Sequence, residues 1–316
     1  SAYNDNIYIH NNLVAQNGGL VEPGAGIGLY TGSDAYRVVD NFISGNFSQS
    51  DGAGIAHYGY SPGGLIADND VVFNQGFDQT VAGGGNAGGM LIAGHEQDVG
   101  AAVTQSVGSG SVTILRNRIQ GNQAGSGDGG GIVLRRINGQ DVLASNNRAN
   151  WHTIDILNNL VVNNVAGYRA GGIIMQDALS VRLINNTISN NDSTATAGNA
   201  LPPAIFTTAG ATSTPQPAGV VLLAPSSELL TGLSGGQLGQ VNNAASRPQV
   251  TNNIVLGNRS LVWATTSPVG GIANSPGSGA GTLQVAARPF WDVQVVGAPL
   301  SAMTLSANLL TTDSSV

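Results

Sequence analysis

Short stretches of alternating hydrophobic and polar residues recur along the chain, and most of them lead into the same arrangement of asparagines. This arrangement is Asn, one residue, a hydrophobic residue, two residues and a second Asn, as in Asn12-Leu13-Val14-Ala15-Gln16-Asn17. It occurs seven times, with a Val or Ile between the asparagines in every copy. The leading asparagines are Asn12, Asn41, Asn69, Asn117, Asn159, Asn186 and Asn253.

Two further elements accompany each repeat. A segment with a period of two, such as Val112-Thr113-Ile114-Leu115, precedes most copies and is typical of a β-strand. A small residue, a Gly and a hydrophobic residue follow the first six copies, as in Ala25-Gly26-Ile27. The three elements together predict a turn of three short strands separated by three bends.

The spacing of the repeats indicates a solenoid. Successive leading asparagines lie 29, 28, 48, 42, 27 and 67 residues apart, which indicates a base unit of about 28 residues with insertions. Helical repeats require long segments of 3.6-residue period, and a propeller blade requires four hairpin strands in about 40 residues. We therefore predict an all-β chain forming a single right-handed parallel β-helix of about seven coils.

A parallel stack explains why the same residue types recur. Equivalent residues of neighbouring coils lie about 4.8 Å apart, so Val and Ile stack into a dry core. Stacked Asn side chains can bond the coils above and below as a ladder, and Asn tolerates left-handed backbone at a bend. Gly permits bends that a Cβ would block. We predict that these recurring residues are structural.

Insertions interrupt the repeat and carry its variety. They cover residues 75–111, 123–127, 137–152, 192–217 and 225–248. Between Asn258 and Ala302 no clear repeat is visible, whereas Ala307-Asn308-Leu309-Leu310 resembles the start of another repeat. We expect residues 1–258 to form the β-helix and residues 259–316 to form a C-terminal cap or a continuation of the β-helix with a long insertion. Loops outside a solenoid are where function is usually found.

Composition excludes several classes of function. Only 9% of the residues are charged, the formal net charge is −7, and all 11 basic residues are Arg. The longest basic run is Arg135-Arg136, so we expect no nucleic-acid partner. Without Lys, Schiff-base and Lys-dependent lyase chemistry is excluded. No run of 18 apolar residues occurs, so no membrane-spanning helix is expected. Because the chain begins and ends within repeats, we expect a processed chain or a piece of a longer one.

The paired Gly-Gly-hydrophobic and hydrophobic-x-x-Asn elements resemble the repeats of polymorphic outer-membrane proteins. They are also similar to those of the wider group of right-handed β-helix repeat proteins, over residues 9–258. This chain has Val or Ile where the first family has Phe. The resemblance implies a parallel β-helix. It also implies a function among autotransporter-type adhesins, other surface proteins, and polysaccharide lyases, hydrolases and epimerases.

Alignment of the coils predicts a polar strip beyond the Gly-hydrophobic strand. One row contains Tyr30, Tyr58, Ala93, Arg135 and Gln176, and the next contains Arg136 and Asp177, with His57 and His95 nearby. One hypothesis is a carbohydrate groove, with Tyr stacking on sugar rings, Arg binding carboxylates, and Glu96 or Asp98 acting as acid or base. The alternative is a solvated face with Arg136 paired to Asp177.

A second row offers a candidate metal site. Asp51, Asn86 and Asp128 each lie three residues before the Gly of the motif in consecutive coils. Stacked oxygens of this kind could hold Ca²⁺, the only cofactor that we consider. The alternative is that these side chains cap the amides of turns.

No catalytic motif is visible. Histidine pairs at metal spacing, a Gly-x-Ser-x-Gly elbow with triad partners and a Walker-type loop are missing, as are the paired-Asp and Gly-His-Gly patterns of β-helix pectin hydrolases. We expect an extracellular or cell-surface bacterial protein without a catalytic role, such as a filament, sheath, surface-layer or adhesin element. We expect its partner to be itself, by head-to-tail or lateral assembly. The alternative is a β-helix that binds or cleaves polysaccharides.

Overall fold

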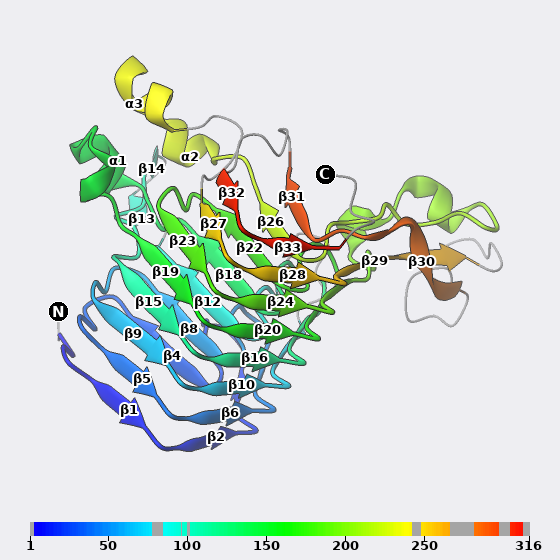
Figure 1. Ribbon diagram of the computed structural model, residues 1–316, viewed down its shortest axis with the longest axis horizontal. Coiled ribbons are helices and arrows are strands. Elements are labelled where there is room, and N and C mark those ends of the chain that lie inside the picture. Colours follow the sequence, from blue (N-terminus) through cyan, green and yellow to red (C-terminus); the bar gives the residue numbers. More distant parts are fainter. Residues whose placement is uncertain are drawn as a thin grey trace.

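The computed structural model describes residues 3–77, 85–95, 97–99, 102–241, 248–265, 281–296 and 304–311, with the backbone alone for residues 97–99, 102–104, 206 and 304. Most of its strands belong to four stacked parallel sheets, as a β-helix-like solenoid requires (Figure 1). Each turn of the chain, here called a coil, adds one strand to each sheet in the order A, B, C, D. The described regular secondary structure is therefore mostly β, with little helix.

The strands of each sheet follow one another by coil. Sheet A contains β1 (Tyr8–His10), β5 (Arg37–Val39), β9 (Gly64–Ala67), β15 (Val112–Leu115), β19 (Ile154–Leu157), β23 (Val181–Ile184), β27 (Gln249–Thr251) and β32 (Thr304–Ser306). Sheet B contains β2 (Leu13–Ala15), β6 (Phe42–Ser44), β10 (Asp70–Val72), β16 (Arg118–Gln120), β20 (Leu160–Val162), β24 (Thr187–Ser189), β28 (Ile254–Leu256) and β33 (Leu309–Leu310).

The other two sheets complete each coil. Sheet C contains β3 (Gly18–Gly19), β7 (Phe47–Ser48), β11 (Gln75–Gly76), β17 (Gln123–Ala124), β21 (Val165–Ala166), β25 (Asp192–Ser193), β29 (Arg259–Thr265) and β30 (Gly281–Phe290). Sheet D contains β4 (Ile27–Tyr30), β8 (Ile55–Tyr58), β12 (Met90–Ala93), β18 (Ile132–Arg135), β22 (Ile173–Gln176), β26 (Val220–Leu222) and β31 (Val293–Val295).

The coil has four strands where the sequence pattern predicted three. The extra strand is the short one of sheet C, which begins directly after the second Asn of each repeat. The chain bends before this Asn because the preceding residue has a positive φ, as at Phe73 (57°) and Asn163 (56°). The bend separates sheet B from sheet C, and a two-residue strand leaves no period that a sequence pattern could reveal.

The core consists of columns of hydrophobic residues that repeat from coil to coil. In sheet B, the parallel register places Val14, Ile43, Val71, Ile119 and Val161 at equivalent positions. From Ile43 onwards these side chains are completely buried. Burial of a side chain of this size stabilises the fold by about 1.5–3 kcal/mol, so the stacked columns supply most of its stability.

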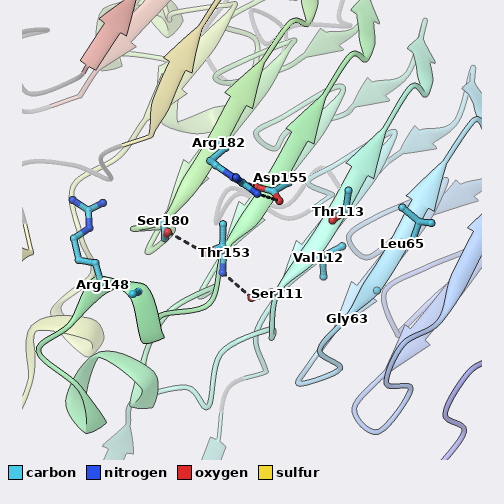
Figure 2. A pocket seen from close by; sticks show the side chains of 12 residues that line it. Gly63, Leu65, Ser111, Val112, Thr113, Arg148, Thr153, Asp155, Ser180 and Arg182 are labelled. Atoms are coloured by element: carbon cyan, nitrogen blue, oxygen red, sulfur yellow. Dashed lines mark hydrogen bonds and ion pairs between the residues drawn. The ribbon is translucent and has the colours of Figure 1, made fainter.

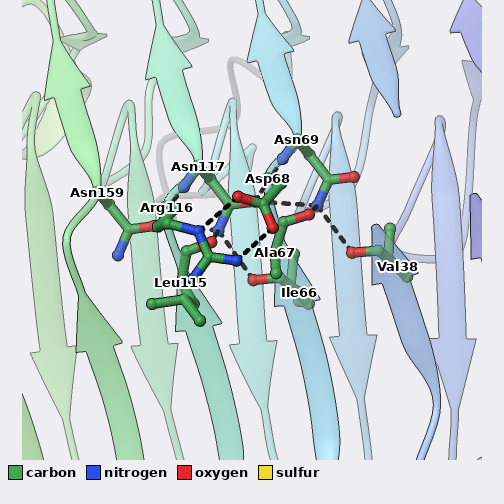
Figure 3. Close-up of polar contacts among 9 residues, drawn as sticks. All are labelled: Val38, Ile66, Ala67, Asp68, Asn69, Leu115, Arg116, Asn117 and Asn159. Carbon is green, nitrogen blue, oxygen red and sulfur yellow. Dashed lines mark hydrogen bonds and ion pairs between the residues drawn. The ribbon is translucent and has the colours of Figure 1, made fainter. Parts of the chain in front are cut away.

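Two asparagine ladders run along the coils, one at each end of the sheet B strands. In the first, the backbone N–H and Nδ2 of Asn69 donate to Oδ1 of Asn117 at 3.0 and 2.9 Å, and Asn117 donates to Asn159 in the same way (Figure 3). The seven predicted asparagines of this ladder, together with Asn308, form this contact from coil to coil. The predicted ladder is therefore present.

The ladder asparagines do not themselves adopt the left-handed backbone that the sequence suggested. The residue before each one does: φ is 57° at Asp68 and 54° at Arg116. On the outer surface these two residues form an ion pair across the coils, with Arg116 Nη2 2.6 Å from the Asp68 carboxylate (Figure 3). The bend residue thus turns the chain, and the following Asn ties the turn to the next coil.

Insertions gather at the corner between sheets D and A. They contain the hairpin β13 (Gln97–Val99) and β14 (Ala102–Thr104), α1 (Gln140–Ala144), the 3₁₀ turn η1 (Arg148–Asn150), α2 (Ser227–Leu230) and α3 (Gly235–Gln240) (Figure 1). Val142, Trp151, Leu179, Leu229, Leu233 and Val241 form a separate buried cluster there, here called the corner cluster. Segments far apart in sequence therefore share one small core.

A second projection extends from sheet C. Strands β29 and β30 pair antiparallel and reach away from the stack (Figure 1). The 192–217 insertion contributes the 3₁₀ turns η2 (Gly198–Ala200) and η3 (Pro203–Phe206), and Thr212 bridges to Ala264. Past residue 258, described strands continue all four sheets. None of the helices described has the length and apolar character needed to cross a membrane.

Candidate functional site on the outer face of sheet D

The outer face of sheet D is covered where the chain bends from sheet C into sheet D. The outward side chains Leu91, Val133, Ile174 and Val221 are at most 2% exposed. They form a second buried cluster with small residues of these bends, including Ala87. The bends therefore fold back over the sheet and bring their own polar residues to the ends of its strands.

The predicted aromatic row is present. Tyr30 pairs in register with Tyr58, and Tyr58 pairs with Ala93. The Tyr30 and Tyr58 rings meet edge to face at 6.4 Å, and the exposed His95 ring meets Tyr58 at 5.0 Å. The Tyr30 hydroxyl donates to the carbonyl of Pro23 at 2.6 Å. Burial, followed by the charges of Glu22 and Tyr58, raises the pKa of Tyr30.

Arg135 continues this row and joins it to the predicted calcium residues. Its guanidinium lies 3.1 Å from Asn86 Oδ1, 3.6 Å from the Asp128 carboxylate and 3.7 Å from the Asp51 carboxylate. The two rows, which the sequence treated as separate candidates, therefore form one polar cluster. The Arg135 guanidinium therefore lies between the oxygen atoms of Asp51, Asn86 and Asp128, which were the predicted calcium ligands.

The oxygens of this cluster also accept hydrogen bonds from the backbone. Asn86 N donates to Asp51 Oδ1, and Asp128 N donates to Asn86 Oδ1, both at 2.8 Å. These contacts form a third short ladder and match the arrangement expected of side chains that cap turns. In the described part of the chain, no three His, Cys, Asp or Glu side chains are placed to hold a metal ion.

Arg169 completes the cluster, and the sequence analysis missed it. Its Nε and Nη2 donate to the two oxygens of the buried Asp128 at 3.0 and 2.8 Å. Burial lowers the pKa of Arg169, but the hydrogen bond and charge of Asp128 outweigh this effect and raise it. Arg169 lies three residues before Gly172, as Asp128 does before Gly131. The row of Asp51, Asn86 and Asp128, extended by one coil, therefore leads to Arg169.

His57 lies inside the core, away from the strip. Its position is equivalent to Leu29 and Ile92, which point inward, and it is completely buried. Nδ1 lies 2.8 Å from the Tyr36 hydroxyl, and Nε2 lies 2.9 and 3.0 Å from the carbonyls of Gly59 and Ser109. Two carbonyl acceptors require a proton on Nε2, so Tyr36 donates to Nδ1. Burial lowers the pKa of His57 to about 4.

The last residues of the strip anchor the insertions of the D–A corner. Arg136 Nε lies 3.1 Å from the Glu228 carboxylate, and Asp177 accepts from Ser226 N at 2.7 Å. Gln176 Nε2 donates to Ala224 O at 3.2 Å. Burial raises the pKa of Asp177 against the opposing hydrogen bonds from Ser226 and the charge of Arg136. These three side chains are therefore engaged in holding the 223–241 segment.

The acid or base candidates do not form a described site. Glu96 and the side chain of Asp98 lie outside the described residues. Asp128 and Asp177 belong to two different sets of contacts, one with Arg169 and the other with Ser226.

A groove on sheet A was not predicted. It has a volume of about 580 Å³ and is lined by Thr113, Asp155 and Arg182 of the sheet, by Ser111, Thr153 and Ser180 at the starts of its strands, and by Arg148 (Figure 2). Arg182 forms a two-pronged ion pair with Asp155, and Thr153 N donates to Ser111 Oγ at 2.9 Å. Arg148 comes from the 137–152 insertion, whose path no repeat predicts.

Comparisons with known proteins found no matching family model, curated protein or solved structure.

Proposed function

We propose that this chain is a non-catalytic structural protein of the bacterial cell surface or extracellular space, built as a single right-handed parallel β-helix. Filament, sheath, surface-layer and adhesin elements belong to this class. Right-handed winding is the rule for crossovers between parallel strands, and the motifs resemble those of polymorphic outer-membrane and autotransporter-type surface proteins.

The pairing of charged side chains across coils carries this proposal. Arg116 pairs with Asp68, Arg118 with Asp70, Arg169 with Asp128, Arg182 with Asp155 and Arg259 with Asp192, each joining neighbouring coils. Each exposed ion pair contributes only about 0–1 kcal/mol to the stability of the fold. We therefore infer that these pairs serve to set the register between neighbouring coils. Charges that are engaged between coils suit a scaffold better than a reaction site.

The direction of the ladders supports assembly from head to tail. Each Asn of the first ladder from Asn12 to Asn253 donates to the Asn of the following coil, as Asn253 N does to Asn308 Oδ1 at 2.9 Å. A second copy stacked on the first would place its Asn12 to accept from Asn308. Half-exposed Ile9 and Val14 of the first coil would then pack against Leu305 and Leu310. The contact would continue the core and the ladder together.

Electron microscopy and analytical ultracentrifugation of the whole chain test this proposal. We expect filaments or concentration-dependent oligomers, and Val14→Asp should prevent them by burying a charge while leaving the circular dichroism spectrum unchanged. Leu160→Asp, on the outer side of sheet B, is the control. Monomers at high concentration together with a cytoplasmic location in the native source would refute the proposal.

The aromatic contacts of Tyr30, Tyr58 and His95 favour a second candidate, a β-helix that binds carbohydrates or cleaves polysaccharides. Glycan-array binding and polysaccharide cleavage would be measured for Tyr58→Ala, for Arg135→Ala and for the control Tyr60→Ala. Loss of either activity in the first two variants alone would support this candidate. Unchanged glycan binding and polysaccharide cleavage in both variants would exclude the polar strip as the carbohydrate site.

A further inference from the structure

Three phenylalanines surround a groove at the bend between sheets B and C. The groove has a volume of about 530 Å³ and is lined by Gly45, Asn46, Phe47, Phe73, Gln75 and Phe77. Its lining residues follow β6 and β10 along the chain, and Figure 1 shows these two strands side by side. The rings of Phe47 and Phe77 are 5.9 Å apart and inclined at 53°. We propose that this groove, here called the Phe groove, binds a neutral saccharide.

The backbone at Phe73 is the first argument. Phe73 has a φ of 57°, in a row of bend residues that all have a positive φ. The other members of the row are Gln16, Gly45, Gly121, Asn163, Asn190 and Gly257. Gly and Asn adopt this conformation readily, whereas a bulky residue there is a rare outlier. An aromatic side chain that is 63% exposed gains little from burial, so its place in this row needs another explanation.

Neighbouring glycines give the rings their positions. A Cβ at Gly121, one coil above Phe73, would lie 2.6 Å from the Phe73 ring. A Cβ at Gly18, one coil below Phe47, would lie 2.8 Å from the Phe47 ring. The two rings therefore lean in opposite directions over glycine backbone, and the groove that they line also includes Gly45 and Asn46. Side chains at those glycines would displace the rings.

The chemistry of the lining selects the ligand. All six lining residues are uncharged. Aromatic rings attract the C–H face of a sugar ring because that face is apolar and slightly positive, whereas the π-face is negative. Gln75 is exposed, and its amide can both donate to and accept from hydroxyl groups. Charged saccharides would find no counter-ion in the lining.

Size separates a saccharide from a protein partner. A stable protein interface involves about 20–30 residues on each side, whereas pockets for small ligands occupy about 300–1,000 Å³. A groove of about 530 Å³ with six lining residues matches the second class. The saccharide proposal does not depend on the scaffold proposal. A filament can form without binding a glycan, and a monomer can bind a glycan without forming a filament.

Affinity electrophoresis of the whole chain tests the inference. The probes are hydroxyethyl cellulose, laminarin, galactomannan and amylopectin, with polygalacturonate as the anionic comparison. We expect at least one neutral probe to retard the protein. Phe73→Asn should lower the affinity at least about tenfold, which corresponds to about 1.4 kcal/mol. The same change should leave the melting temperature unchanged or raise it, because Asn fits the left-handed backbone.

Phe47→Ala provides a second variant that does not alter the strained bend, and Leu160→Ala removes an exposed apolar residue elsewhere on sheet B as the control. Retardation should fall with Phe47→Ala and stay unchanged with Leu160→Ala. The inference fails if none of the four neutral probes retards the wild type, or if both Phe variants bind as the wild type does. It also fails if the Phe variants change only the oligomeric state.

Discussion

Asparagine at the ladder positions satisfies the backbone of two coils with one side chain. Asn122 accepts from Asn74 N and Nδ2 at 3.0 Å each, and its own Nδ2 donates to Val71 O and Asn164 Oδ1. Neither Asp nor Gln reproduces this geometry, because Asp has no donor and Gln is one methylene longer. The buried Asp292 shows the exception. Its Oδ1 accepts from Asn258, while its Oδ2 accepts from Thr311 N.

Asn122→Ala is expected to destabilise the fold strongly. It leaves Asn74 N buried without its partner and removes one of the hydrogen bonds to Val71 O, and a buried unsatisfied group costs about 1–3 kcal/mol. Urea unfolding followed by circular dichroism would measure the loss. Thr113→Ala, at a half-buried outward position of the same coil, should change the free energy of unfolding by less than about 0.5 kcal/mol. Equal effects of the two substitutions would contradict the role of the ladder.

His57 makes the stability depend on pH. Its pKa is about 4 in the fold and near 6.5 in the unfolded chain, so the unfolded state binds the proton more tightly. The stabilisation that the fold gains from the neutral His57 is complete above about pH 6.5 and is lost as the pH falls towards 4. The difference corresponds to roughly 3 kcal/mol. Unfolding curves between pH 7.5 and 4.5 should show a flatter dependence for His57→Gln than for the wild type.

Thr113→Gln, at a half-buried outward position, provides the control for this measurement, because it changes no titratable group and should retain the slope of the wild type. The slopes of the variant and the wild type must be compared, because Asp177 also makes the stability depend on pH and does so in the opposite direction. The pKa of Asp177 is raised, so its contribution is lost as the pH rises. Identical slopes for His57→Gln and the wild type would contradict the buried neutral imidazole.

At the scale of elements, the insertions have their own packing. Gln237 Nε2 donates to the carbonyls of Val142 and Leu143, so α3 is held against α1 across 94 residues of sequence. Gln105 donates in the same way to Leu229 and Thr231. Three insertions from different coils are thus joined by side-chain contacts that do not belong to the repeat. We therefore expect the corner cluster to open while the sheets stay folded.

Trp151→Ala should demonstrate this separation. Trp151 is 3% exposed in the corner cluster, and its removal should cost about 3–5 kcal/mol locally. Hydrogen exchange should show lost protection in α1, α2 and α3 while β19, β20 and β23 remain protected. Leu143→Ala, at a residue that is 39% exposed, is the matched control. A uniform loss of protection across the sheets would show that the insertions and the stack unfold as one unit.

At the scale of the whole molecule, each coil contacts mainly its two neighbours. Stability in such an array is approximately a sum of coil and interface contributions. The register in which Arg37 faces Leu65 means that residues 37–64 form one complete coil. Removing them would bring β4 next to β12, with Leu29 beside Ile92 in the core and Asn12 beside Asn69 in the ladder.

We expect the deletion of residues 37–64 to leave a folded, shorter solenoid with β-type circular dichroism and cooperative unfolding. A deletion of residues 37–50, about half a coil, should prevent folding because every later residue moves back by 14 positions, which places Asn69 at the core position of Ile55 and Tyr60 at the ladder position of Asn46. Thermal unfolding and light scattering would distinguish the two. Equal behaviour of the two deletions would contradict a stack that depends on the register of whole coils.

The sequence by itself determined what repeats. Seven copies of the Asn motif predicted the parallel sheets, the core columns and the ladder, because a local pattern that recurs at one period has one way to bury its hydrophobic residues. The inward position of His57 was also available, since its row otherwise contains residues such as Leu29 and Ile92.

Only the tertiary structure decided where the irregular residues meet. It placed Arg135 between Asp51 and Asp128, joined the corner insertions into one cluster and opened the Phe groove between rings of neighbouring coils. These contacts depend on how side chains lean across a bend and on loops that follow no period. Their geometry is set by packing between residues that are distant in the sequence. The repeat pattern carries no information about this packing.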